Sequence, residues 1–228
     1  MENQILQSEY HYNILGAPDY AYLEIKIPAN DTLKVEASAM ATMDTNIEMK
    51  TKFKGGLSRF LTGESLFINE FTAKNASGTI GIAPSAPGDL KHIYLSGDEV
   101  IYLQNSAFVA AGMNVLVESK WQGLTRGFFS GEGLFLVKCS GTGDLFFNSF
   151  GGIIPLSVSD GYVVDTGNIV AFTGGLTYDI KSVGGLKSLF LSGEGLVANF
   201  SGQGTIWVQT KKVRPLISWA QPFRPEAG

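Results

Sequence analysis

The 228-residue chain is predicted to be an all-β protein in which one β unit occurs three times. Three observations predict this class. Apolar and polar residues alternate along many short segments, glycine is abundant at 28 residues while proline is modest at 8, and one sequence block recurs three times. Alternation with a period of two is typical of half-buried strands, and glycine supplies the positive φ that turns need. We therefore expect a single β domain over residues 1–228 with little helix.

Strands are expected first where the alternation is clearest. Leu23, Ile25 and Ile27 alternate with polar residues, and similar patterns cover residues 33–37 and 47–50. By contrast, Leu134-Phe135-Leu136-Val137 and Val163-Val164 have little polar interruption. Uninterrupted apolar runs are typical of strands that are covered on both faces. No segment combines a sustained 3.6-residue period with helix caps, so little helix is predicted.

The recurring block is Ser/Thr-Gly-Glu followed by an apolar pair, and each copy comes after a Gly-Leu pair. The copies are Thr62–Phe67, Ser130–Phe135 and Ser192–Val197. We interpret each block as a hairpin turn and expect repeats over approximately residues 33–98, 99–161 and 162–212. Because one such unit cannot close a core alone, the three are expected to pack as a pseudo-threefold β-prism or sandwich.

Two further features complete the predicted organisation. Gly141-Thr142-Gly143 and Gly202-Gln203-Gly204 are interpreted as a second set of repeated hairpin turns, because neither continues to a third glycine or opens a helix. Residues 213–228 carry three of the eight prolines and little periodicity. They are expected to form an irregular C-terminal tail draped over the domain, with a subunit contact as the alternative.

The triple Gly-Leu and Ser/Thr-Gly-Glu pattern resembles the family named after altered inheritance of mitochondria (mitochondrial biogenesis), a former domain of unknown function. The stretches Val35–Met40 and Asn46–Lys50 resemble it too, and the likeness covers roughly residues 20 to 212. The resemblance implies a β-rich fold like that of the tryptophan RNA-binding attenuation protein (TRAP). It also implies a link of mitochondrial members to inner-membrane organisation, and no established activity or catalytic residues in prokaryotic members. Without a presequence, this chain resembles a prokaryotic member.

Two sets of repeated residues are candidate binding groups. Glu64, Glu132 and Glu194 could form a three-carboxylate cation site, although a solvated turn tip is the favoured interpretation because no further Asp or Asn recurs beside all three. Arg59, Arg126 and Lys187 stand near aromatic pairs and could form a ring that contacts anionic lipid headgroups or an acidic partner. The favoured alternative is that the aromatic residues belong to the core and the cations cover an edge.

Several kinds of chemistry are not expected. His11 and His92 are the only histidines, so no metal site is predicted, and Cys139 lies alone in an apolar strand as a structural thiol. No nucleophile motif or cofactor loop is present. The net charge of −4 argues against a nucleic-acid partner. The single cysteine, the absence of a signal sequence and the lack of a long apolar run favour a cytoplasmic location.

The resulting hypothesis is a non-enzymatic binding or scaffold protein without a cofactor that forms a homo-oligomer. A peripheral membrane-associated protein is one alternative, with the basic and aromatic residues as its contact. RNA binding is the other alternative, and it is suggested only by the superfamily that the resemblance implies.

Overall fold

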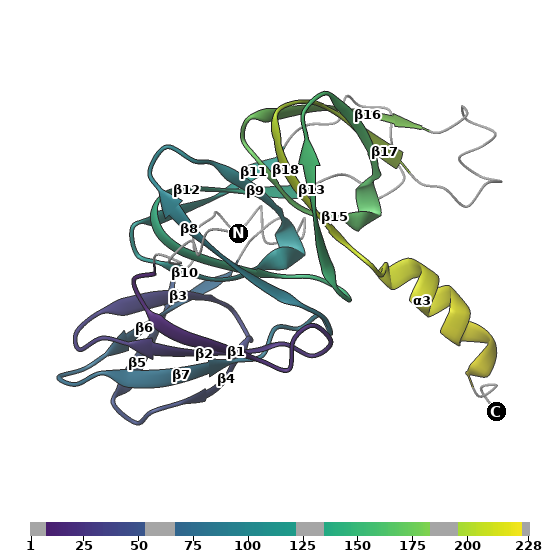
Figure 1. Cartoon of the computed structure of the whole chain (residues 1–228). Coiled ribbons are helices and arrows are strands. Elements are labelled where there is room, and N and C mark those ends of the chain that lie inside the picture. The colour runs from purple at the N-terminus through teal and green to yellow at the C-terminus, as the bar shows by residue number, and fades with distance from the viewer. Residues whose placement is uncertain (1–7, 53–66, 122–134, 183–195, 225–228) are drawn as a thin grey trace.

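A computed structural model describes residues 8–52, 67–121, 135–182 and 196–224. Antiparallel strands dominate these residues and one short α-helix follows them, so the predicted all-β class with little helix is confirmed. The strands group into three modules that follow one another along the molecule, and helix α3 extends away beyond the third (Figure 1).

The first module contains two stacked sheets. One has the strand order β1-β2-β7-β4, and the other contains β3, β6 and β5. The strands are β1 (His11–Leu15), β2 (Tyr22–Ile27), β3 (Thr32–Glu36), β4 (Met40–Met43), β5 (Ile47–Lys52), β6 (Ile68–Ala73) and β7 (Gly78–Ile82).

The second and third modules are built on the same plan. The second contains β8 (Leu90–Ser96), β9 (Ile101–Gln104), the 3₁₀ turn η1 (Asn105–Ala107), β10 (Phe108–Gly112), β11 (Val115–Trp121) and β12 (Phe135–Asn148). The third contains β13 (Ile153–Val158), β14 (Gly161–Asp165), η2 (Thr166–Asn168), β15 (Ile169–Thr173), β16 (Leu176–Ser182), β17 (Leu196–Gly202) and β18 (Gly204–Gln209).

One pairing pattern occurs in all three modules. We number the strands of the pattern from β3, β9 and β14, which are the first strands. The first strand and the third (β5, β11 or β16) flank the fourth, which is β6, the first half of β12, or β17. The second strand (β4, β10 or β15) and the strand directly before the first (β2, β8 or β13) flank the fifth, which is β7, the second half of β12, or β18. Each of these strands therefore has a counterpart in the other two modules, whereas β1, which pairs with β2, has none.

The Gly-x-Gly segments are bends between sheets, so their prediction as hairpin turns is wrong. Strand β12 runs through Gly141-Thr142-Gly143, pairing with β11 and β9 before the bend and with β10 and β8 after it. Gly141 has φ +97°, and a Cβ at this position would collide with the backbone oxygen of Asn114. Gly202, with φ +100°, takes the same place between β17 and β18. Positive φ lets the chain change sheets without reversing its direction.

Neighbouring modules are joined by two antiparallel strand pairs, which we call the first and second joints. At the first joint β10 pairs with β3, and at the second joint β15 pairs with β9. These pairs merge sheets of all three modules into one 11-stranded sheet. A closed threefold arrangement would need a third joint between β4 and β14, and the described strands form none.

Each module has its own core, and the cores extend across the joints. Phe71, Ile80 and Leu33 of the first module pack in one cluster with Val109, Ala110 and Phe146 of the second. The second core takes in Val170, Ala171 and Trp207 of the third module. Apolar burial at the joints favours a fixed arrangement of the modules, because separating them would expose these side chains to water.

The alternation predicted for β3 fails at Lys34, which is 7% exposed. Its ammonium group donates hydrogen bonds to the backbone oxygens of Met113 at 2.9 Å, in the turn between β10 and β11, and of Val115 at 2.7 Å, at the start of β11. Strand β3 is covered on this face by the second module, which a pattern read along one strand does not reveal.

The C-terminal segment differs from its prediction as an irregular tail draped over the domain. Residues Val213–Ala220 form helix α3, and Gln221–Phe223 form the 3₁₀ turn η3. Figure 1 shows α3 leaving β18 and pointing away from the sheets. None of the helix residues is buried.

Candidate functional site

The six residues predicted as binding groups lie outside the described residues. Glu64 and Arg59 fall in 53–66, Glu132 and Arg126 in 122–134, and Glu194 and Lys187 in 183–195. Whether the three carboxylates or the three cations meet on one surface stays a prediction.

Within the described ranges, no three His, Cys, Asp or Glu residues are grouped as a metal site would need. Cys139 is fully buried in β12, where burial raises the pKa of its thiol to about 12. A thiol of this kind is a poor nucleophile at neutral pH, because the thiolate is the reactive form. Cys139 therefore fits its predicted structural role.

A buried carboxylate forms the centre of the one polar cluster that we take as the candidate site. The side chain of Asp144, on the second half of β12, has no exposed surface. Its Oδ2 accepts hydrogen bonds from Ser8 Oγ at 2.8 Å and from the backbone amides of Glu9 at 2.9 Å and Tyr10 at 3.0 Å. The carboxylate thus attaches the segment before β1 to the second module.

The other oxygen of Asp144 binds a histidine. His92 on β8 contacts Asp144 Oδ1 through Nε2 at 2.8 Å, and its Nδ1 lies 2.9 Å from the hydroxyl of Tyr12. A carboxylate only accepts hydrogen bonds, so the pattern places a proton on Nε2, and in the neutral imidazole Nδ1 then accepts from the tyrosine hydroxyl. The rings of Tyr12 and His92 also pack against Phe146, with centroids 5.0 and 4.9 Å away.

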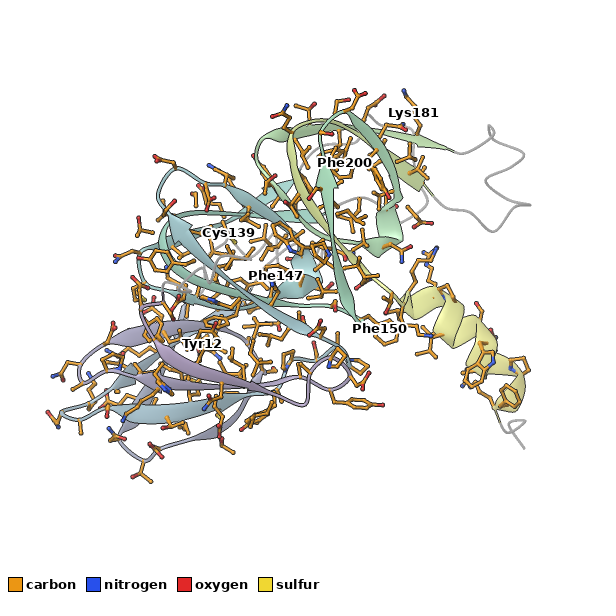
Figure 2. All side chains as sticks on the ribbon, viewed as in Figure 1. Tyr12, Cys139, Phe147, Phe150, Lys181 and Phe200 are labelled. Carbon is orange, nitrogen blue, oxygen red and sulfur yellow. The ribbon has the colours of Figure 1, made fainter. Side chains whose placement is uncertain are left out.

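The order Tyr12–His92–Asp144 has the form of a nucleophile, a base and an orienting carboxylate. Its electrostatics oppose that use. Burial, followed by the charge of Asp144, raises the pKa of the Tyr12 hydroxyl, so the phenolate is disfavoured. Ser8 contacts Asp144 rather than the imidazole, so it has no general base. The cluster is therefore arranged to hold β1 and its preceding segment on the second module. Figure 2 labels Tyr12, which lies in the first module near the second.

Sequence reasoning weighed His92 only as a metal ligand and did not select Asp144. The available signal was one acid directly before the apolar run Leu145-Phe146-Phe147. A carboxylate inside such a strand requires compensation if it is buried. Its partners Ser8 and His92 are distant in the sequence and belong to different elements, so no motif links them.

Glu36, at the end of β3, predicts a pH dependence of stability. Burial raises the pKa of this carboxyl to about 7, from its ordinary value of 4.5. The fold favours the protonated form of Glu36, so ionising this carboxyl lowers the stability of the folded state. This loss of stability is absent below about pH 4.5, grows as the pH rises and is complete above about pH 7. Glu36→Gln should raise the free energy of unfolding at pH 8 by about 1–2 kcal/mol and change it little at pH 4. Urea unfolding at both pH values measures the change in the free energy of unfolding. An equal change at pH 4 and pH 8 would contradict the raised pKa of Glu36.

Comparison with known proteins gives consistent results. A family model described as mitochondrial biogenesis AIM24 matches residues 12–211. An uncharacterized protein of Streptococcus pyogenes serotype M6 is 25% identical over 240 residues, covering 100% of this chain and 96% of the relative. A crystal structure of a protein from Streptococcus pyogenes superposes with a TM-score of 0.79 at 25% identity, covering 94% of this chain and 100% of that chain.

Proposed function

The chain belongs to the mitochondrial biogenesis AIM24 family, and we propose that it is a non-enzymatic scaffold protein that holds surfaces in fixed relative positions. The observation that carries this proposal is the pair of joints. Strand β10 continues the sheet of the first module and β15 continues that of the second, so three modules share one 11-stranded sheet. A body built in this way is suited to present surfaces at set distances.

The use of the buried polar groups supports the same proposal. Asp144 binds the segment before β1, His92 bridges Asp144 and Tyr12, and Lys34 satisfies two backbone oxygens across the first joint. Each of these groups stabilises an attachment between parts of the chain. The hydrogen-bonding capacity of these buried groups is thus used within the chain.

A distance measurement tests the rigid body. We place spin labels at Met49→Cys on β5 and Thr177→Cys on β16, which are exposed positions in the first and third modules. Cys139 can stay, because it is buried and its thiol pKa is about 12. Doubly labelled chains diluted into unlabelled protein should give one narrow distance distribution by pulsed electron resonance. A broad or multi-peaked distribution would overturn the proposal.

A turnover screen tests whether the protein is an enzyme. Purified wild-type protein and Tyr12→Phe, which removes the hydroxyl group from His92, are compared on a broad set of metabolites and nucleotides. The proposal expects no turnover by either protein. Reproducible turnover by wild type that is lost in folded Tyr12→Phe would make the cluster catalytic and the scaffold proposal wrong.

Helix α3 favours peripheral membrane association as a second candidate function. Val213, Leu216, Ile217, Trp219 and Phe223 are all exposed large apolar residues, with Trp219 68% and Phe223 75% exposed. Lys211, Lys212, Arg214 and Arg224 lie in or beside this segment of the sequence, which contains no Asp or Glu over residues 211–224, and Lys212 pairs with Asp165 at 3.0 Å. Exposed aromatic residues beside cations match the chemistry of an anionic bilayer surface. No helix in the described ranges is long and apolar enough to cross a bilayer.

Vesicle flotation tests this second function. Trp219→Ala combined with Phe223→Ala should reduce binding to vesicles of phosphatidylcholine and phosphatidylserine at least about tenfold, because apolar burial contributes to interfacial binding. Tyr20→Ala is the matched control, since Tyr20 is 77% exposed but lies far from α3 in the chain. Equal binding of the double variant and wild type, or no binding by either, would reject membrane association through α3.

A further inference from the structure

We infer that β4 of one copy of this chain pairs with β14 of a second copy, in the same way that β10 pairs with β3 and β15 with β9. The surface is the pair of open strand edges at the two ends of the module series, and the partner is another copy of the chain. This inference rests on the proposed scaffold role and names the partner of the scaffold.

The pairing pattern supplies the first argument. Within each chain, the second strand of a module pairs with the first strand of the module before it, at both joints. The second strand of the first module, β4, has no preceding module, and the first strand of the third module, β14, has no following one. Both end their sheets among the described strands, in the orders β1-β2-β7-β4 and β14-β17-β16. Figure 1 shows β4 on the side of the first module that faces away from the second.

Burial supplies the second argument. All five residues of β10 are buried, as are the first four of β15, whereas three of the four residues of β4 are exposed. Strand β3 has three buried residues and β9 has two, whereas β14 starts with three exposed residues. The apolar side chains left exposed at these edges are Met43, Tyr162 and Val163. The counterparts of Met43 and Tyr162 at the joints are Ala111, Phe172, Leu33 and Ile101, which are at most 2% exposed, and those of Val163 are the buried Lys34 and the half-buried Tyr102.

The composition of the edges supplies the third argument. Strand edges that stay in water are usually protected by charged residues or proline. The edge strands β5, β11 and β16 contain both acidic residues and lysine, and β13 contains Pro155. Strand β4 has no charged residue and no proline, and β14 has only Asp165 at its end. These two edges therefore lack the usual protection against pairing; β1 (HYNIL) is a further edge strand without Lys, Arg, Asp, Glu or proline, but its module has no unmade joint on that side.

The sequence gives a fourth, independent indication. The uninterrupted pair Val163-Val164 is typical of a strand covered on both faces. In one chain Val164 is 7% exposed but Val163 is 58% exposed. A second copy seated on this edge provides the missing cover.

The two joints also fix the register of the contact. Lys34 lies opposite Ala111 at the first joint, and Tyr102 lies opposite Phe172 at the second. The counterparts of these pairs are Val163 and Met43, so Val163 of one copy lies opposite Met43 of the other. Each chain offers one edge of each kind, so the contact is head-to-tail rather than symmetric.

A charge-swap experiment tests the pairing through the mass of the assembly, measured by sedimentation. Wild type should sediment as an assembly of several chains. Met43→Asp together with Val163→Asp places like charges opposite each other and should weaken association at least about tenfold, giving monomer. Met43→Lys together with Val163→Asp places opposite charges there and should restore association.

The control is Met49→Asp, because Met49 on β5 is 48% exposed and Met43 is 41% exposed. This variant should keep the wild-type mass. A monomeric wild type, an unchanged mass for the Asp pair, or no restoration by the Lys-Asp pair would overturn the inference. None of these outcomes changes the distance distribution within one chain, so the failure of the edge contact is distinguishable from the failure of the rigid scaffold.

Discussion

Asp144→Ala should lower the free energy of unfolding by about 3–5 kcal/mol, since it removes a fully buried carboxylate that accepts hydrogen bonds from several donors. Ser8 Oγ, two backbone amides and the imidazole of His92 all donate to this carboxylate. Without it, the segment before β1 loses its attachment to the second module. Urea unfolding at neutral pH, followed by circular dichroism and fitted with the slope free to vary, measures the change.

Asp160→Ala is the matched control, because Asp160 is an exposed acid on the same protein. It should change stability by less than about 0.5 kcal/mol. Asp144→Asn should fall between the two, since it keeps one acceptor oxygen but loses the charge. A loss below about 1 kcal/mol for Asp144→Ala would show that the cluster does not hold the N-terminal segment.

Phe172→Ala is the second large effect that we expect, at about 3–5 kcal/mol of lost stability. Phe172 on β15 is 1% exposed and lies at the second joint. Its ring stacks on Tyr102 of the second module, with centroids 5.2 Å apart, and meets Phe200 and Tyr178 edge-on at 5.2 and 5.4 Å. The substitution removes these contacts and leaves a cavity between two modules.

Calorimetry distinguishes a loss of stability that spreads across the second joint from one confined to the third module. If the modules unfold together, Phe172→Ala should lower the temperature of one single unfolding transition. If the modules unfold independently, one transition would move to lower temperature and another would stay unchanged. Phe223→Ala is the matched control, since this ring is 75% exposed on the turn after α3. A wild-type-like transition for Phe172→Ala would contradict the role of the second joint.

The class of fold was predictable because its causes are local. The alternation of Leu23, Ile25 and Ile27 with Glu24 and Lys26 places one face of β2 inside, and all three apolar residues are fully buried. Cys139 was predictable as a buried thiol for the same reason, because its strand is apolar. Such patterns depend on the two-residue period of a strand and need no knowledge of its neighbours.

The features that the sequence predicted wrongly or not at all depend on contacts between distant segments. Lys34 looked like the polar face of β3, but the second module covers that face and supplies two backbone acceptors. Glycines in Gly141-Thr142-Gly143 suggested a turn, yet whether a chain reverses or changes sheets is decided by the strands beside it. Helix α3 escaped prediction because eight residues are too short for a periodic pattern, and Pro215 lies within its first turn.

The candidate site was hidden for a similar reason. Asp144 gathers partners from the segment before β1 and from β8, so no spacing along the sequence marks the cluster. At the open edge of β14, the sequence pattern predicted more burial than one chain shows. The apolar Val163 is typical of a strand covered on both faces, but it is exposed in a single chain. There, the mismatch between the sequence pattern and the monomer was itself informative.

Cysteine cross-linking tests most directly whether one kind of joint connects both modules and copies. Two differently tagged chains are mixed, one with Met43→Cys and the other with Val163→Cys, and oxidised mildly. Opposed residues of antiparallel strands have Cα atoms about 4.5–5.5 Å apart, which fits a disulfide. We predict a disulfide between the two tags, and far less with Met49→Cys in place of Met43→Cys. Absence of the cross-link, or equal cross-linking of both cysteines, would contradict the pairing of β4 with β14.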